Sequence, residues 1–172
     1  PVMVHPAPAA PVSPELFRCA TFFSPNEHEA AAMAGHPIRV DDAGANEDDL
    51  RAVADIFREK GVENLIVTLG GNGSVAVNKD GVARVQSVKM PVVADTTAAG
   101  DSFVASFSTL WCGGLPARQA LAFASHAAAI TVSRPGAIPS LPTLAEVTAL
   151  LRERGYEDMD YDLLAQLEEK SK

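Results

Sequence analysis

Apolar residues recur at helical spacing in the segment that follows Asn46. Leu50, Val53 and Phe57 fall on one helical face, and three acidic residues directly after Asn46 occupy the first turn. Asn46 has the side chain of a helix cap, and Gly61 stands just past the end of the pattern. The spacing therefore predicts an amphipathic helix between these two residues, with one buried face.

The pattern becomes strand-like after that helix. Residues 65–69 are continuously apolar, as expected of a strand buried on both faces in a parallel sheet. Residues 74–78 and 82–88 alternate more loosely on either side of Lys79-Asp80-Gly81, which has the composition of a hairpin turn. A helix followed by a buried strand and a hairpin predicts an α/β fold.

Two short apolar runs near the start, at 2–4 and 20–23, predict further strands. The first leads into a proline-rich segment, which forces the chain along an extended path. Pro25 and Asn26 follow the second run and predict a helix over 27–34.

Four helices are predicted in the second half of the chain. Residues 101–111 and 117–132 are so rich in apolar and small side chains that we expect both helices to pack deep within the protein. Residues 144–154 and 161–170 predict two closing helices, the last with a polar face.

Composition narrows the possible functions. The chain of 172 residues is 47% hydrophobic, which suits one globular domain. A net charge of −8 excludes partners that require a clustered basic surface, such as nucleic acid or an anionic membrane. No run reaches the roughly 20 apolar residues of a membrane span. Cys19 and Cys112 lie far apart without companion ligands, so we expect buried, reduced thiols in a cytoplasmic protein.

The segment 95–103 carries the most informative chemistry. Its small residues lead a turn into the start of an apolar helix, a geometry that binds anions through backbone N–H groups. The amides of Ala98, Ala99 and Gly100 could stabilise a phosphoryl group in transfer. Asp101 at the helix start could act as a general base or simply as a helix cap, and the spacing alone favours neither.

Residues 95–101, Asp-Thr-Thr-Ala-Ala-Gly-Asp, resemble the signature of the ribokinase family of carbohydrate kinases. Residues 26–29, 68–73 and 133–142 match further family segments in the same order. The resemblance implies a three-layer α-β-α fold with a mostly parallel central sheet and a small antiparallel hairpin. It also implies that Asp101 is the catalytic base and that Ala98, Ala99 and Gly100 form an anion hole.

The resemblance further implies ATP, Mg2+ and K+ as cofactors. The implied nucleotide-binding residues are Asn26, Thr68, Leu69, Gly70, Gly71, Asn72, Gly73, Gly100, Asp101 and Ser125. The implied metal-site residues are Glu29, which with Asn26 organises magnesium, and Asp95, Thr97, Thr131, Arg134, Gly136 and Ser140, which hold potassium mostly through backbone carbonyls.

Plainer interpretations of three of these elements stay open. Asn26 and Glu29 form an ordinary helix start, and the glycine-rich segment 70–73 also has the composition of a turn between strands. The adenine contact falls on Ser125, where relatives carry Asn or His, while the next residue, His126, suits either an adenine contact or helix packing.

The resemblance covers residues 1–152 as a nucleotide-binding and catalytic part and leaves 153–172 as a helical extension. The family's amino-terminal half, with most sugar contacts, has no counterpart, so we expect a chain truncated at its amino terminus. The leading hypothesis is an ATP-dependent kinase of a primary hydroxyl on a pentose or related sugar, ribose first. The alternative is a non-catalytic nucleotide-binding or interaction module. Either would associate with a second copy or with the absent half.

Overall fold

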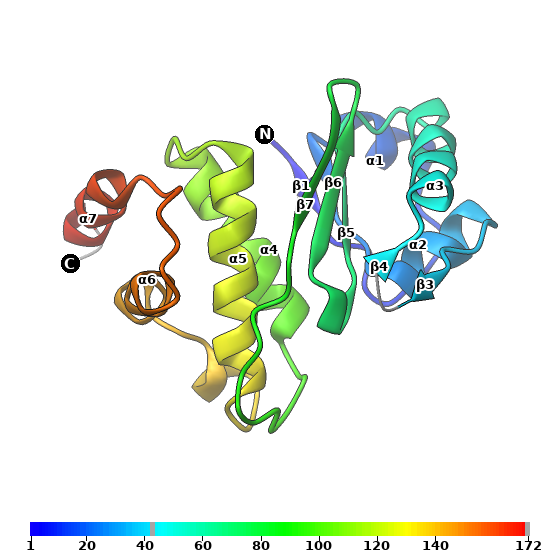
Figure 1. Cartoon of the computed structure of the whole chain (residues 1–172). Coiled ribbons are helices and arrows are strands. Elements are labelled where there is room, and N and C mark those ends of the chain that lie inside the picture. The colour runs from blue at the N-terminus through cyan, green and yellow to red at the C-terminus, as the bar shows by residue number, and fades with distance from the viewer. Residues whose placement is uncertain (42–43, 171–172) are drawn as a thin grey trace. The chain divides into compact units, whose positions relative to one another are not determined.

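The chain divides into two compact units in the computed structural model, which describes residues 1–41 and 44–170 (Figure 1). The first unit is Pro1–Gln86 and the second is Ser87–Lys172. Within the described part of the chain, no helix combines the length and the apolar character needed to cross a membrane.

The first unit is built on a mixed five-stranded sheet with the order β1-β2-β5-β6-β7. The strands are β1 (Met3–Val4), β2 (Phe22–Phe23), β5 (Leu65–Thr68), β6 (Ser74–Asn78) and β7 (Gly81–Val85). The pairs β1–β2 and β2–β5 are parallel, whereas β5–β6 and β6–β7 are antiparallel. The strands and the hairpin predicted from apolar spacing are therefore confirmed.

Three helices pack around an aromatic core in this unit. They are α1 (Pro14–Cys19), α2 (Glu27–Ala34) and α3 (Glu47–Glu59). Phe17 from α1, Phe23 from β2 and Phe57 from α3 meet with ring centroids 5.2–6.0 Å apart. The Lys60 ammonium lies 5.4 Å from the centre of the Phe57 ring and 5.5 Å from the centre of the Phe17 ring. The Lys60 side chain therefore covers the cluster at its edge.

The start of α3 follows the predicted cap. The Asn46 Oδ1 accepts the Asp49 amide at 3.1 Å, and Leu50, Val53 and Phe57 are fully buried. Asp49 is also buried, and its carboxylate receives the Arg39 side chain at 2.7 and 2.8 Å and the Arg39 amide at 2.9 Å. This bonding ties the helix to the short ribbon of β3 (Val40–Asp41) and β4 (Gly44–Ala45).

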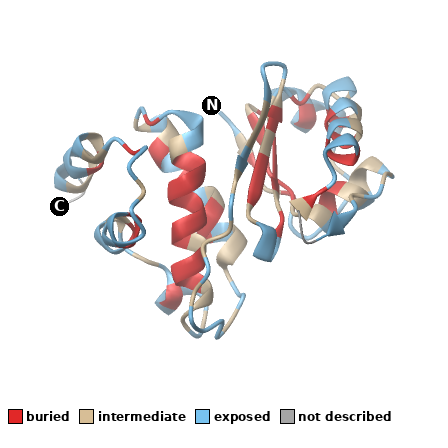
Figure 2. Cartoon of the chain, viewed as in Figure 1, coloured by how far each residue is buried: buried red, intermediate tan, exposed pale blue. Residues whose placement is uncertain are grey.

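The second unit is helical. Its helices are α4 (Ala99–Cys112), α5 (Ala117–Val132), α6 (Leu144–Glu153) and α7 (Tyr161–Lys170), with a 3-10 turn, η2 (Ile138–Ser140), between α5 and α6. α5 is buried along most of its length, as Figure 2 shows, and residues 120–127 are all buried. The deep packing predicted for this helix is confirmed.

The corresponding prediction for α4 is wrong along one face. Phe103, Phe107 and Leu110 are buried, but Ala105 and Cys112 are exposed. Small residues such as Ala suit a buried helix and an exposed one equally, so composition could not separate the two faces. The prediction that both thiols are buried is also wrong. Cys112 lies on the exposed face of α4, and Cys19 at the end of α1 is exposed too; both are free cysteines.

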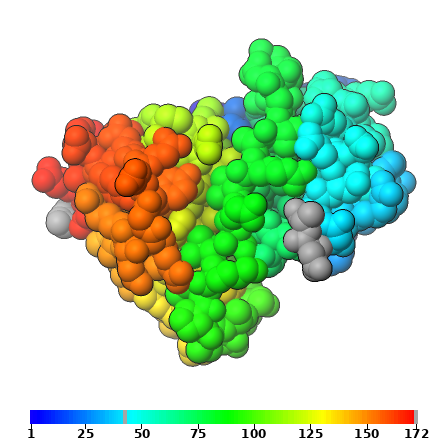
Figure 3. Space-filling model, in the orientation of Figure 1, coloured from blue at the N-terminus to red at the C-terminus, as the bar shows by residue number. Residues whose placement is uncertain are grey.

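The segment that follows α6 and contains α7 packs onto the rest of the second unit (orange to red in Figure 3). Leu164 of α7 is fully buried, and Leu167 lies so close to Gly113 that a Cβ there would meet its Cδ1 at 3.0 Å. The Arg152 guanidinium of α6 lies 4.1 Å from the centre of the Tyr161 ring. This segment is therefore part of the core of this unit.

Lowering the pH should weaken the fold through Asp49. The Arg39 side chain and amide lower the pKa of Asp49 from 3.8 to about 2, so the unfolded chain takes up a proton first. The stabilisation is present above about pH 4 and lost as the pH falls toward 2. Asp49→Asn should flatten the urea stability profile in this window, with Asp55→Asn on the same helix as the control. An unchanged profile in Asp49→Asn would contradict the assignment.

Leu164→Ala should destabilise the chain by about 2–4 kcal/mol, because it removes a fully buried side chain and leaves a cavity. Urea or thermal unfolding followed by circular dichroism measures the loss. Gln166→Ala, on the exposed side of the same helix, should change stability by less than about 0.5 kcal/mol. Equal effects of the two substitutions would show that α7 is not part of the core.

Candidate functional site

The predicted site residues fall in both units. Asn26, Glu29 and residues 68–73 belong to the first unit, and the remaining ones, from Asp95 to Ser140, belong to the second. Each set forms a local arrangement of its own.

Asn26 and Glu29 bond each other at the start of α2. The Asn26 Oδ1 accepts the Glu29 amide and the Glu29 Oε2 accepts the Asn26 amide, both at 2.8 Å. This reciprocal pair is a capping box, so the helix-start interpretation holds for both residues. Each of the two side chains thus serves one backbone amide, and a further role of the Glu29 carboxylate toward magnesium stays a prediction.

The glycine-rich segment closes the end of β5 beside that helix start. The Thr68 amide donates to the Pro25 carbonyl at 3.1 Å, which sets Thr68 next to Asn26 across the sheet. The Leu69 amide donates to the Gly73 carbonyl at 2.8 Å and closes a tight 3-10 turn over Gly70–Asn72. Gly70 and Gly73 have φ of +52° and +88°, a conformation that a side chain disfavours. The structure thus brings these two predicted elements together at one end of the sheet.

Asp95 organises the loop that precedes α4 in the second unit. Its Oδ1 accepts the Thr97 amide at 2.9 Å, and its Oδ2 accepts the Gly136 amide at 3.0 Å. The pKa of Asp95 is lowered first by a hydrogen bond of the Thr97 side chain and then by the Thr97 and Gly136 amides, so the carboxylate stays charged. The amides of Ala94 and Asp95 both donate to the Val132 carbonyl, at 2.8 and 3.2 Å. The loop is therefore held at the end of α5 as well as by its own acid.

The helix start after this loop has an unusual backbone. Ala98 caps α4 in the left-handed conformation, with φ 62° and ψ 6°. A Cβ makes that conformation costly, by roughly 1–2 kcal/mol. The Ala98 carbonyl nevertheless accepts the Ser102 amide at 2.8 Å and begins the helix. The turn therefore begins the helix at the cost of local strain.

Not all of the predicted anion-hole amides are available. The Ala99 amide donates to the Thr96 carbonyl at 3.3 Å, whereas those of Ala98, Gly100 and Asp101 have no acceptor within 1–41 and 44–170. Asp101 is exposed in the first turn of α4, and its carboxylate receives no hydrogen bond from the described residues. Unengaged amides at a helix start and an exposed carboxylate beside them are what an anion site with a base requires.

α5 carries Ser125 and His126. Ser125 is buried, and its hydroxyl finds no partner among the described residues. The His126 Nδ1 lies 2.8 Å from the Ala122 carbonyl oxygen, and the Tyr156 ring packs edge-on against the imidazole, 5.9 Å between centroids. Burial lowers the pKa of His126. These packing contacts therefore account for the position of His126, whereas the Ser125 hydroxyl is left without a hydrogen-bond partner among the described residues.

The predicted potassium residues gather at the junction of α5 with the loop that follows it. The Thr131 Oγ1 donates to the Ser102 Oγ at 2.9 Å and so links α5 to α4, one residue after Asp101 in the chain. Gly136, with φ +85°, bonds Asp95, and the buried Ser140 donates its hydroxyl to the Ala137 carbonyl at 2.6 Å. No group of three or more His, Cys, Asp and Glu side chains suited to a metal occurs in 1–41 or 44–170.

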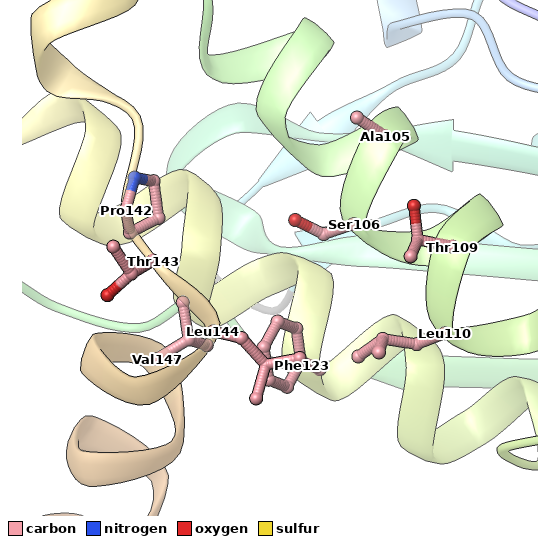
Figure 4. A pocket seen from close by; sticks show the side chains of 9 residues that line it. All are labelled: Ala105, Ser106, Thr109, Leu110, Phe123, Pro142, Thr143, Leu144 and Val147. Atoms are coloured by element: carbon pink, nitrogen blue, oxygen red, sulfur yellow. The ribbon is translucent and has the colours of Figure 1, made fainter. Parts of the chain in front are cut away.

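A separate cavity of about 200 Å3 opens between α4, α5 and the start of α6 (Figure 4). Ala105, Leu110, Phe123 and Val147 give it a mostly apolar lining. None of the predicted site residues lines it. It therefore does not serve as the predicted nucleotide site.

Glu146, the acid that binds Arg134 after the end of α5, was not predicted as a site residue from the sequence. The Arg134 Nη2 donates to the Glu146 Oε1 at 2.5 Å, and the Glu146 Oε2 accepts the Thr143 amide at 2.8 Å. The spacing Thr143-x-x-Glu146 is a capping-box pattern, so the helix start was visible in the sequence. The link to Arg134 was not, because it joins residues that only the fold brings together.

Comparison with known proteins matches this chain to one family. The sequence model described as pfkB family carbohydrate kinase matches residues 1–144. The ribokinase of Schizosaccharomyces pombe is 37% identical over 147 residues, which are 85% of this chain and 45% of that protein. The chain spans about half the length of the curated relatives it matches.

Solved structures agree with the sequence relatives. The ribokinase of Thermotoga maritima is 34% identical with a TM-score of 0.74, over 87% of this chain and 48% of that one. The Arabidopsis thaliana ribokinase, solved with ribose and ATP, is 29% identical with a TM-score of 0.81, over 88% of this chain and 47% of that one. These neighbours confirm the α/β fold of ribokinase type expected from the sequence.

Ala98→Gly should stabilise the chain, because glycine adopts the left-handed conformation without the Cβ cost. The gain should be about 0.5–1 kcal/mol after the extra entropy of glycine in the unfolded state is subtracted. Ala105→Gly, at an exposed position inside the same helix, should instead lose about 1 kcal/mol. Urea unfolding of both variants tests this, and a loss in Ala98→Gly would contradict the strain.

Proposed function

Because the chain belongs to the pfkB family of carbohydrate kinases, we propose that it is the nucleotide-binding and catalytic part of an ATP-dependent sugar kinase. The acceptor is a primary hydroxyl of a pentose or related sugar, with ribose as the first candidate. The observation that carries the proposal is the start of α4, where the exposed Asp101 stands beside amides that have no acceptor in the described part of the chain.

The reaction assigned to these residues is a direct phosphoryl transfer. The Asp101 carboxylate takes the proton of the sugar hydroxyl as its oxygen forms a bond to the γ-phosphorus of ATP. The bond between that phosphorus and the β–γ bridging oxygen breaks, and ADP leaves. The amides of Ala98 and Gly100 and the positive end of the α4 dipole stabilise the negative charge on the transferred group.

Nucleotide binding is assigned to both units. Within the first unit, Asn26, Thr68 and the segment 69–73 are assigned to the phosphates; within the second unit, Ser125 is assigned to the adenine. The buried, unpartnered hydroxyl of Ser125 supports this, because a bound base would offer it a hydrogen bond. Gly100 and Asp101 complete the proposed set at the phosphate end.

The proposal includes two cations, magnesium and potassium, as the resemblance of the sequence to ribokinases implies. Oxygen atoms of Asn26 and Glu29, largely through water, would hold magnesium, which when bound would neutralise phosphate charge. Potassium would take carbonyl oxygens of Asp95, Thr97, Thr131, Arg134, Gly136 and Ser140. The hydrogen bonds of Asp95 to Thr97 and Gly136 support this set, because they bring the two stretches of backbone together.

A second candidate is a non-catalytic nucleotide-binding or interaction module. The observation that favours it is the coverage of the relatives, since the chain spans about half of their length.

We further propose that residues 1–152 are the nucleotide-binding part and residues 153–172 a helical extension. The partner of the chain would be the other half of the kinase fold or a second copy of the chain. The compartment of the protein would be the cytoplasm, where ATP and potassium are abundant.

Asp101→Asn should separate these two functions. If Asp101 is the base, turnover of Mg-ATP and ribose in the presence of potassium should fall by about 10²–10⁴-fold, while the calorimetric affinity for ATP stays within a few-fold. Asp48→Asn, an exposed acid in the first turn of α3, is the matched control and should keep full turnover.

Other outcomes are equally decisive. Turnover of Asp101→Asn within threefold of the unmodified chain would remove the base assignment. ATP binding without turnover in either form would support the binding module. Absence of both binding and turnover in the unmodified chain would overturn the kinase proposal for this chain.

A further inference from the structure

One carboxylate, that of Glu146, closes the loop between α5 and α6 at both of its ends. Its Oε1 lies 2.5 Å from the Arg134 Nη2 at the beginning of the loop. Its Oε2 accepts the Thr143 amide at 2.8 Å and lies 3.0 Å from the Thr143 Oγ1 at the loop's other end. The two oxygen atoms therefore fix the separation of residues that stand nine positions apart.

The loop closed in this way supports the segment before α4. Gly136, two residues after Arg134, donates its amide to the Asp95 Oδ2 at 3.0 Å, and the Asp95 Oδ1 accepts the Thr97 amide. Inside the loop, the Ser140 amide and hydroxyl both bond the Ala137 carbonyl, at 3.2 and 2.6 Å, and Ser140 is fully buried. Glu146 is thus linked to the turn that begins α4 by the hydrogen bond of Arg134, the short stretch of backbone from Arg134 to Gly136, and the hydrogen bonds of Asp95.

We propose that Glu146 is a positioning residue for the helix start that carries Asp101. By holding Arg134 and Thr143 it sets the path of the loop, the loop presents the Gly136 amide to Asp95, and Asp95 sets the turn from which the Ala98, Gly100 and Asp101 amides project. The inference rests on the proposed function only in taking that helix start as the site of phosphoryl transfer.

Geometry, rather than stabilisation of the fold, is the contribution expected of this acid. The side chains of Arg134 and Glu146 are 36% and 42% exposed, and ion pairs of such exposure contribute little to stability. The Arg134 side chain lowers the pKa of Glu146 to about 2, so the pair stays charged at neutral pH.

The experiment compares Glu146→Gln with Glu47→Gln. Gln retains an acceptor for the Thr143 amide, as capping boxes accept Gln, but loses the charge that holds Arg134. Glu47 is the matched control, because it too stands at a helix start and binds an arginine, Arg51, at 2.6 Å with its side chain 48% exposed. Exchange of individual amides is read by NMR on the full chain without nucleotide, and Mg-ATP affinity by calorimetry.

We expect exchange of the Gly136 and Thr97 amides to quicken about two- to fivefold in Glu146→Gln, which is the change in local opening that loss of an exposed ion pair allows. The Val147 amide, which bonds the Thr143 carbonyl, should stay within twofold of the unmodified chain. Glu47→Gln should leave all three amides unchanged. Arg134→Gln should reproduce the Glu146→Gln pattern, and the double variant should add nothing to it.

Unchanged exchange of Gly136 and Thr97 in both Glu146→Gln and Arg134→Gln would overturn the inference. So would a change confined to Val147, because that result is the signature of a helix cap alone. The readout needs no nucleotide, so it is distinct from the proposed function. If the exchange result holds and Mg-ATP does not bind the unmodified chain, the function fails and the positioning role stands. If both hold, Mg-ATP affinity should weaken several-fold in Glu146→Gln and in Arg134→Gln but not in Glu47→Gln.

Discussion

The start of α4 depends on a single acid that uses both of its oxygen atoms. Asp95 accepts one amide from its own turn and one from the loop after α5, and no other side chain joins these two stretches in the described structure. Charge strengthens both hydrogen bonds, and the bonds in turn keep the acid ionised. These hydrogen bonds hold the chain on the amino-terminal side of the left-handed turn at Ala98.

The arrangement suits a protein with a net charge of −8. Binding an anion with lysine or arginine side chains would require a basic patch, and the side chain of Arg134, two residues before the Gly136 that bonds Asp95, is already engaged with Glu146. Backbone amides and a helix dipole supply positive potential without adding a charged side chain. Their geometry then matters more than their number, which explains why several contacts in this unit serve to hold one turn.

The sequence predicted the elements whose causes are local. Asn46 as a cap, the spacing of Leu50, Val53 and Phe57, and the hairpin at Lys79-Asp80-Gly81 each act within a few residues, and each was confirmed. The six-residue helix α1 was missed, because it is too short to show a period. The small residues of α4 could not indicate which face is exposed.

The same division applies to the candidate site. The signature around Asp101 was visible because its residues are contiguous, and the adjacency of Asn26 and Thr68 follows from strands that end together. The contact of Thr131 with Ser102 spans 29 positions, and that of Arg134 with Glu146 joins a loop to a helix, so neither leaves a local pattern. Such contacts are decided by packing, which a single sequence does not display.

The packing of α7 onto Gly113 has a practical consequence for anyone who shortens this gene. The match to the family model ends at residue 144, the first residue of α6, and invites a stop codon there. The polypeptide so produced would lack Leu164, Leu167 and Glu146, leave the turn between α4 and α5 uncovered, and release Arg134. The border of the family model and the border of the folded unit are different places in this chain.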